Sequence, residues 1–236
     1  MELLTINRNG PIRVIWAPFD FAPASPDLVL VGITPGRFQA EMALTAFSAA
    51  LEEGLDVDGA LRRVKTAASF SGPLRRNLVA MLDHIGLHVA LGIDSCAELF
   101  QSTSERVHLT SAIRYPVFID GANYSGAPAM LRTPILRRWI ETTLADEVRS
   151  FARALWVPLG PKPAEALEHL AQNGMMKRAN ILAGLPHPSG ANAERIAFFL
   201  GRKSRSNLSR NTDPQAIEDA LGRLRRQIAA FERAGR

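Results

Sequence analysis

Residues 28–36 read Leu-Val-Leu-Val-Gly-Ile-Thr-Pro-Gly, and this stretch predicts the fold of the chain around it. Its first half is apolar without alternation, which is typical of a strand buried on both faces of a parallel sheet. A glycine and proline turn ends the run, and residues 37–53 follow with the spacing of an amphipathic helix. Because open α/β sheets bind ligands where their strands end, the turn is a candidate ligand site.

Apolar runs and helical segments alternate along the rest of the chain, which indicates parallel strands joined by right-handed crossovers. Further core strands are predicted at residues 106–113, 154–159 and 180–185, and a short edge strand at residues 11–16. Residues 114–128 are polar and predicted to lack regular structure, and a segment of that length is commonly functional. We expect one α/β domain over residues 1–236, a three-layer α/β/α sandwich with a central four-stranded, mostly parallel sheet.

The composition limits the classes of protein to consider. Hydrophobic residues make up 47% of the chain, and the net charge of +5 is compatible with a polyanionic partner without requiring one. The single cysteine, Cys96, excludes an internal disulfide and a cysteine-rich metal site. No apolar run approaches the length of about 20 residues that a membrane span needs, and no signal peptide is recognisable. We therefore expect a cytoplasmic protein with no membrane partner.

Four short pieces of sequence follow one another in a suggestive order. They are Gly-Ile-Thr-Pro-Gly at residues 32–36, Phe-Ser-Gly at 70–72, Leu-Thr-Ser-Ala at 109–112 and His-Pro-Ser-Gly-Ala-Asn at 187–192. Together they resemble motifs of the uracil-DNA glycosylase superfamily, and the first piece is most similar to the Gly-Ile-Asn-Pro-Gly form of its mismatch-specific branch. The resemblance extends over residues 28–200. It implies an enzyme that hydrolyses the bond between a base and its sugar in DNA.

A base must leave the duplex stack before it can be cut from its sugar, so such a site needs a flat apolar platform and polar groups that read the base edge. The resemblance assigns the platform to Phe70 and the base edge to Ser111. A core position is the alternative for Phe70, although its small neighbours favour a ligand contact. The other base-binding residues expected are Gly32, Ile33, Pro35, Gly36, Asn123 and Tyr124.

Breaking the glycosidic bond leaves negative charge on the departing base, which a hydrogen-bond donor can stabilise as an oxyanion hole does. The resemblance gives this catalytic role to His187, with Thr34 as the second catalytic residue. The alternative is a loop histidine with a purely structural role. His187 stands between two prolines at a strand end, and this fixed backbone favours the functional interpretation.

The segment after His187 is the expected DNA contact. The resemblance implies that its loop inserts beside the flipped nucleotide and that a basic run then follows the phosphate backbone. The residues concerned are Ser71, Pro188, Ser189, Gly190, Asn192, Arg195, Lys203 and Arg205. In the alternative interpretation Ser189 or Asn192 only caps a helix, and the basic run is a solvated face.

Two positions depart from the superfamily pattern. Thr34 stands where an acidic or amide residue usually positions water, and a threonine hydroxyl is no base near neutral pH. Catalysis would then rest on His187 or recruit a carboxylate, for which the candidates are Asp20, Glu41 and Asp120. Ser111 stands where an asparagine usually pairs with uracil, so strong selection of uracil is not expected.

Gly36 suggests which base is removed. Branches that reject thymine have a bulky side chain beside the C5 position of the base, and a glycine leaves that side open. Polar residues 120–126 offer groups for a hydroxylated substituent. We therefore expect a 5-modified pyrimidine, such as the glucosylated 5-hydroxymethylcytosine of phage DNA that some superfamily members excise as an antiviral defence. No cofactor is expected, because the chain lacks the iron–sulfur cysteines of some branches of the superfamily. A monomer is expected.

Three other functions remain open from the sequence. The first is uracil or mismatch repair, for which Thr34 and Ser111 are unusual. The second is a DNA-binding relative without catalysis, and the third is a hydrolase of free nucleosides or nucleotides.

Overall fold

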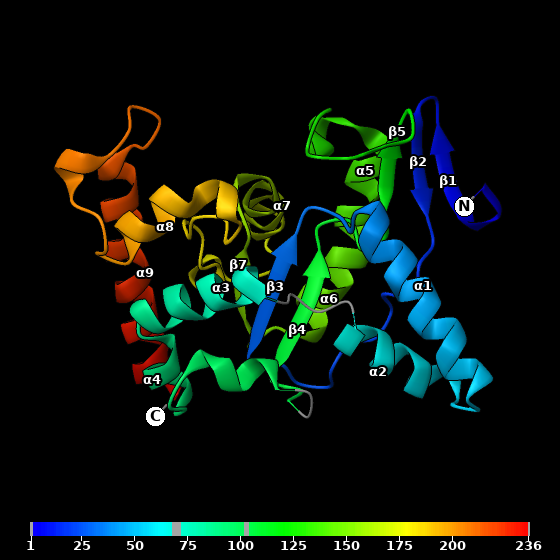
Figure 1. Ribbon diagram of the computed structural model, residues 1–236, viewed down its shortest axis with the longest axis horizontal. Coiled ribbons are helices and arrows are strands. Elements are labelled where there is room, and N and C mark those ends of the chain that lie inside the picture. The colour runs from blue at the N-terminus through cyan, green and yellow to red at the C-terminus, as the bar shows by residue number, and fades with distance from the viewer. Residues whose placement is uncertain (1, 68–71, 102–103, 236) are drawn as a thin grey trace.

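The computed structural model describes residues 2–67, 72–101 and 104–235, and it consists of helices around two sheets (Figure 1). The strands of the parallel sheet alternate with helices along the chain, so the predicted α/β class is confirmed. Phe70 and Ser71 lie outside the described residues.

Residues 28–32 form the middle strand of a parallel sheet. Strand β3 (Leu28–Gly32) pairs with β4 (Val107–Ser111) on one side and with β7 (Leu155–Pro158) on the other. The four apolar residues before Gly32 are fully buried, as the lack of alternation predicted. Gly32 pairs with Ser111, so the two candidate motifs end side by side at the carboxyl edge of the sheet.

The predicted fourth strand at residues 180–185 is reduced to a single bridge. Ile181 pairs with Trp156, and the amide of Leu182 donates to the carbonyl of Trp156 at 2.8 Å. The chain then turns at Gly184, whose φ of +118° suits glycine alone. A Cβ at Gly184 would come within 2.8 Å of Ala220, so the last helix leaves no room for an extended strand with a side chain here. Within the described ranges, the parallel sheet therefore has three strands, not four.

The structure also contains an antiparallel sheet, which shows that the predictions for residues 11–16 and 114–128 were wrong in part. Its strands are β1 (Thr5–Asn9), β2 (Ile12–Ile15), β5 (Val117–Ile119) and β6 (Ala122–Asn123), in that order. Strand β2 is internal rather than an edge strand, and the segment 114–128 contains two strands rather than none. Asp120 and Gly121, with φ of +49° and +81°, form the two-residue turn between β5 and β6. Asp-Gly is a strong signal for such a turn.

Helices cover both faces of the parallel sheet, because side chains of β3 alternate between two cores. Leu28 and Leu30 belong to one apolar cluster, and Val29 and Val31 belong to the other. The first cluster includes residues of α3 (Gly72–His84), α4 (Leu87–Leu91), α8 (Ala193–Phe199) and α9 (Pro214–Gly235). The second includes residues of α5 (Pro134–Trp139), a π-helical turn (Ile140–Leu144), α6 (Ala145–Ser150) and α7 (Pro161–Gln172).

The remaining elements are shorter or lie beside this body. Helices α1 (Arg37–Glu52) and α2 (Val57–Ala67) pack against each other after the first motif, on the side of the antiparallel sheet (Figure 1). Short 3-10 turns occur at Glu2–Leu4, Cys96–Phe100, Met130–Arg132, Arg178–Asn180, Gly190–Asn192 and Arg205–Asn207. Cys96 is fully buried, and burial raises the pKa of its thiol. Within the described ranges, every helix is too short or too polar to cross a membrane.

Candidate functional site

A cavity of about 440 Å³ opens at the carboxyl ends of β3 and β4. Thr34 from the first motif, Ser111 from the end of β4 and His187 from the late turn all line it. The structure thus brings together three segments that are far apart in the sequence. The predicted site residues that line the cavity are Gly32, Ile33, Thr34, Pro35, Ser111, Tyr124 and His187.

Two predicted base-binding residues do not line the cavity. A Cβ at Gly36 would meet the side-chain amide of Asn123 at 3.5 Å, so Gly36 faces the β5–β6 hairpin. The Oδ1 of Asn123 in turn accepts a hydrogen bond of 2.9 Å from the amide of Arg37, at the start of α1. Asn123 therefore ties a helix to a hairpin, and the open space expected beside Gly36 is not part of the cavity.

His187 is half-buried and held in one tautomer. The amide of Ser189 donates to its Nδ1 at 3.3 Å, which leaves Nε2 to carry the proton of the neutral ring. Burial lowers the pKa of His187, so the imidazole is neutral near pH 7. Asn77 of α3 donates to the carbonyl of Pro188 at 2.9 Å and fixes the loop. The cavity lining thus includes a neutral imidazole whose Nε2 carries the proton.

Thr34 presents an acceptor to the cavity rather than a donor. Its hydroxyl donates to the backbone carbonyl of Tyr115 at 2.7 Å. The hydroxyl proton is committed to this bond, so the free lone pairs of the oxygen can accept from a water molecule or a ligand.

The three carboxylates considered as replacements for the missing base have different surroundings. Glu41 and Asp120 are exposed and outside the cavity lining. Asp20 accepts a hydrogen bond from the hydroxyl of Tyr115 and lies 3.7 Å from the guanidinium of Arg114. Asp20 does not line the cavity itself, but its neighbours in sequence do.

Arg114 is a cavity-lining residue that the sequence analysis missed. The Oε1 of Glu147 accepts from Nε of Arg114 at 3.0 Å and from its Nη2 at 2.6 Å. Glu147 is only 5% exposed and also accepts from the hydroxyl of Thr110 at 3.2 Å. Burial alone would raise the pKa of Glu147, but His108 and Arg114 lower it overall. No local pattern links these residues, because tertiary packing alone brings α6 to the end of β4.

The apolar walls of the cavity also come from an unexpected place. Phe19 and Phe21 line it, although their proline-rich loop reads in the sequence as a simple connection into the sheet. The guanidinium of Arg62 lies 4.7 Å from the ring centre of Phe21. Gln39, Lys65 and Ser125 add polar groups to the lining. The sequence did offer one signal for this wall, because Phe19 and Phe21 alternate with other residues between Pro18 and Pro23.

The loop after His187 does not follow the helix-capping alternative. Neither Ser189 nor Asn192 makes a side-chain cap to the turn or helix that follows it. Instead the side-chain amide Nδ2 of Asn192 donates to the hydroxyl of Ser189 at 3.3 Å, while Pro188 is buried and Gly190 is exposed. Arg195 is exposed and donates to the backbone carbonyl of Asn211 at 3.0 Å.

Of the three basic residues expected to follow DNA, Lys203 and Arg205 are already paired with acids. Lys203 lies 2.7 Å from Glu194, and Arg205 lies 3.2 Å from Glu218. Glu194 also accepts hydrogen bonds from Ser209 and Thr212. The hydrogen bond from Lys203 is the largest of the contacts that lower the pKa of Glu194 to about 2. Glu194 thus organises the basic loop, and the positive charge of Lys203 is largely compensated.

Within the described residues, no cluster of histidine, cysteine and acidic side chains is arranged to hold a metal ion. No protein-family model and no solved structure matches the chain. It is 35% identical over 209 residues to the uncharacterized protein YoxB of Bacillus subtilis, and the alignment covers 86% of this chain and 82% of YoxB.

Proposed function

The chain belongs to the family of YoxB, and we propose that it is a DNA glycosylase that hydrolyses the N-glycosidic bond of a flipped, non-standard pyrimidine and leaves an abasic site. The first candidate for the base is a 5-modified cytosine, such as the glucosylated 5-hydroxymethylcytosine of phage DNA, which would make the activity an antiviral defence. A uracil-DNA glycosylase-like fold is part of the proposal. Its support is the parallel sheet with helices on both faces and both motif turns at one cavity.

The observation that carries the proposal is the neutral N–H donor of His187 in the same cavity as the Thr34 turn. In the reaction the bond between C1′ of the sugar and N1 of the base breaks, and its electron pair stays on the base. A neutral imidazole N–H that donates to a base oxygen stabilises this developing charge. Water then adds to C1′ and loses a proton to solvent.

The rest of the cavity suits a flipped base. Its volume of about 440 Å³ falls within the range of about 300–1,000 Å³ for small-molecule sites. Phe19 and Phe21 offer aromatic surface, while Gln39, Ser125 and Arg114 offer polar groups around it. A pyrimidine ring alone needs less space, so the volume favours a base with a substituent. Space for a substituent beside the base therefore depends on the volume of the whole cavity, because Gly36 does not line it.

The water step depends on orientation rather than on a strong base. Thr34 can accept a hydrogen bond from water because its own proton is bound to the Tyr115 carbonyl. Asp20 contacts the lining residue Arg114, but its carboxylate is already engaged there and by the hydroxyl of Tyr115. We therefore assign most of the rate enhancement to His187, as leaving-group stabilisation.

Base release from defined duplexes tests the proposal. The purified protein is incubated with DNA that carries one uracil, one thymine mismatch or one glucosylated 5-hydroxymethylcytosine. Abasic sites are measured by alkaline cleavage and the free base by mass spectrometry. We expect release of the modified cytosine, reduced about 100- to 1,000-fold by His187→Ala because one oxyanion donor is lost.

His84→Ala is the matched control, since burial also lowers the pKa of His84 and this residue lies outside the cavity lining. Release from uracil DNA alone would favour repair instead. Release from none of the three substrates, with tight DNA binding, would favour the DNA-binding relative without catalysis.

A further inference from the structure

A second hollow, of about 600 Å³, lies on the surface of α5 and the π-helical turn. Arg132, Arg137 and Arg138 line it together with Glu141 and Thr142. We call it the α5 groove. All three arginines are exposed, so the groove carries more positive than negative charge.

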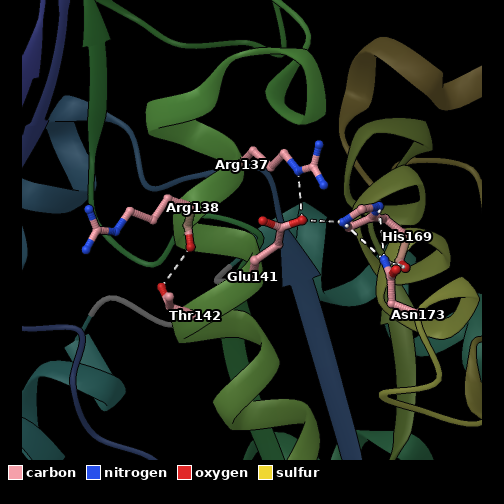
Figure 2. A network of polar contacts seen from close by, with 6 residues as sticks. All are labelled: Arg137, Arg138, Glu141, Thr142, His169 and Asn173. Atoms are coloured by element: carbon pink, nitrogen blue, oxygen red, sulfur yellow. Dashed lines mark hydrogen bonds and ion pairs between the residues drawn. The ribbon is translucent and has the colours of Figure 1, made fainter.

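The single acid of the groove is already engaged. Glu141 lies 2.7 Å from Arg137 and 2.9 Å from Nε2 of His169, and Figure 2 shows it between the two with Arg138 extending away. Among the residues that the structure describes, Arg132 and Arg138 make no side-chain hydrogen bond or ion pair. Two guanidinium groups of the groove therefore have no ion-pair partner in the part of the chain that the structure describes.

The backbone around Arg138 is fixed. The ring of Trp139 packs edge-on against Tyr115 with centroids 5.4 Å apart, and Ile140 is fully buried. Thr142 donates to the carbonyl of Arg138 at 2.7 Å within the π-helical turn. Because Trp139 and Ile140 face the interior, Arg138 is held on the outer side of the helix.

The groove lies at the same end of the molecule as the cavity. Helices α5 and α6 lead into β7, which is parallel to β3, so α5 begins near the carboxyl ends of the strands. Figure 1 shows α5 toward the arrowheads of β3 and β4, with α6 below it. Tyr115 connects the two sites, because its carbonyl binds Thr34 and its ring packs on Trp139.

We propose that the α5 groove binds the phosphate backbone of duplex DNA that lies across the cavity, with Arg132 and Arg138 as the phosphate contacts. The inference rests on the proposed function, which supplies the DNA. Arginine is suited to this contact because its planar fork matches phosphate oxygens in two parallel hydrogen bonds. The surface differs from the one that the sequence suggested, since Lys203 and Arg205 are held by Glu194 and Glu218.

The salt dependence of DNA binding tests this inference. Binding of a labelled, unmodified duplex is measured by fluorescence anisotropy over a series of salt concentrations. Each lost phosphate contact should reduce the slope of log affinity against log salt by about 0.9. We expect the double variant Arg132→Gln/Arg138→Gln to lose about 1.8 of slope for its two contacts. Both side chains are exposed, so the melting temperature should stay unchanged.

The double variant Lys203→Gln/Arg205→Gln is the control, and its slope should match that of the wild-type protein. An unchanged slope in the α5 variant, or a larger loss in the control, would overturn the inference even if the wild-type protein releases a base. A reduced slope in the α5 variant combined with no base release would overturn the proposed function alone. Absence of duplex binding by the wild-type protein would overturn both.

Discussion

At His187 two separate features favour the same protonation state. Burial removes the charged imidazolium from water, and the Ser189 amide needs a lone pair on Nδ1. A protonated Nδ1 could not accept from the Ser189 amide, so burial and this hydrogen bond both favour the neutral ring. Near pH 7 the His187 ring is therefore in its neutral, hydrogen-bond-donating form and needs no carboxylate partner.

This state predicts the pH dependence of the proposed base release. Because the pKa of His187 is lowered, the neutral donor is fully present above the ordinary histidine value of about 6.5 and is lost only as the pH falls below it. We expect a rate that is flat from neutral pH upward and decreases on the acid side. NMR titration of the His187 ring should give a midpoint below that of a free histidine, and a midpoint above it would contradict the assignment.

Thr34 can be tested by a pair of substitutions. Thr34→Val leaves the half-buried Tyr115 carbonyl without its 2.7 Å partner, and an unsatisfied group of this kind costs about 1–3 kcal/mol. Thr34→Ser keeps the hydroxyl and should lose much less. Denaturant unfolding of both variants measures the difference. Equal stabilities would show that the hydroxyl has no structural role.

Individual site residues differ in how far the sequence reveals them. Thr34 and His187 could be found because each lies in a turn that follows an apolar run, whereas Ser111 at the end of β4 was assigned by the resemblance. Gly36 lies one residue beyond Pro35 in the sequence, but the start of α1 turns it toward Asn123. Arg114 owes its place to Glu147 on a different layer, which a single sequence cannot reveal.

At the scale of elements, three strands of the parallel sheet were predicted, and the two short strands of the β5–β6 hairpin were missed. The β3 and β7 segments are apolar runs, so their burial follows from composition, while β4 is more polar and only its first two residues are buried. The fourth run failed as a strand because Gly184 packs against Ala220, which is a long-range contact. The β5–β6 hairpin, by contrast, has a local Asp-Gly signal that outweighs the polar character of the segment.

The hairpin turn gives a prediction for Gly121. Its φ of +81° is a conformation that side chains disfavour, so Gly121→Ala should cost about 1 kcal/mol of folding free energy. Gly190→Ala is the control, because Gly190 has no positive φ and its added Cβ would meet nothing within 4 Å. Thermal unfolding of the two variants measures the contrast. A Gly121 variant as stable as the control would contradict the turn assignment.

For the whole molecule, the buried pair of Glu147 and Arg114 joins the layer of α6 to the cavity. Glu147→Gln removes the charge that balances a largely buried guanidinium, and breaking such a pair costs about 3–5 kcal/mol. The pKa of Glu147 is lowered in the fold, so its contribution is present above the ordinary carboxyl range and is lost as the pH falls through the folded value.

Denaturant unfolding at neutral and acid pH measures this contribution. Glu141→Gln is the control, because Glu141 also has a lowered pKa from Arg137 and His169 but lies at the surface groove. We expect a large loss for Glu147→Gln at neutral pH, a smaller one in acid, and little change for Glu141→Gln. Equal losses at both pH values would contradict the ionised state.

The buried thiol of Cys96 has a practical consequence. The chain has one cysteine, it is fully buried, and its raised pKa keeps it in the unreactive thiol form. A cysteine introduced at exposed Gly190 would therefore be the one position in the folded protein open to maleimide dyes or spin labels. Attached there, next to the His187 turn, a probe would test directly whether the proposed DNA ligand approaches this loop, and Cys96 would not have to be replaced first.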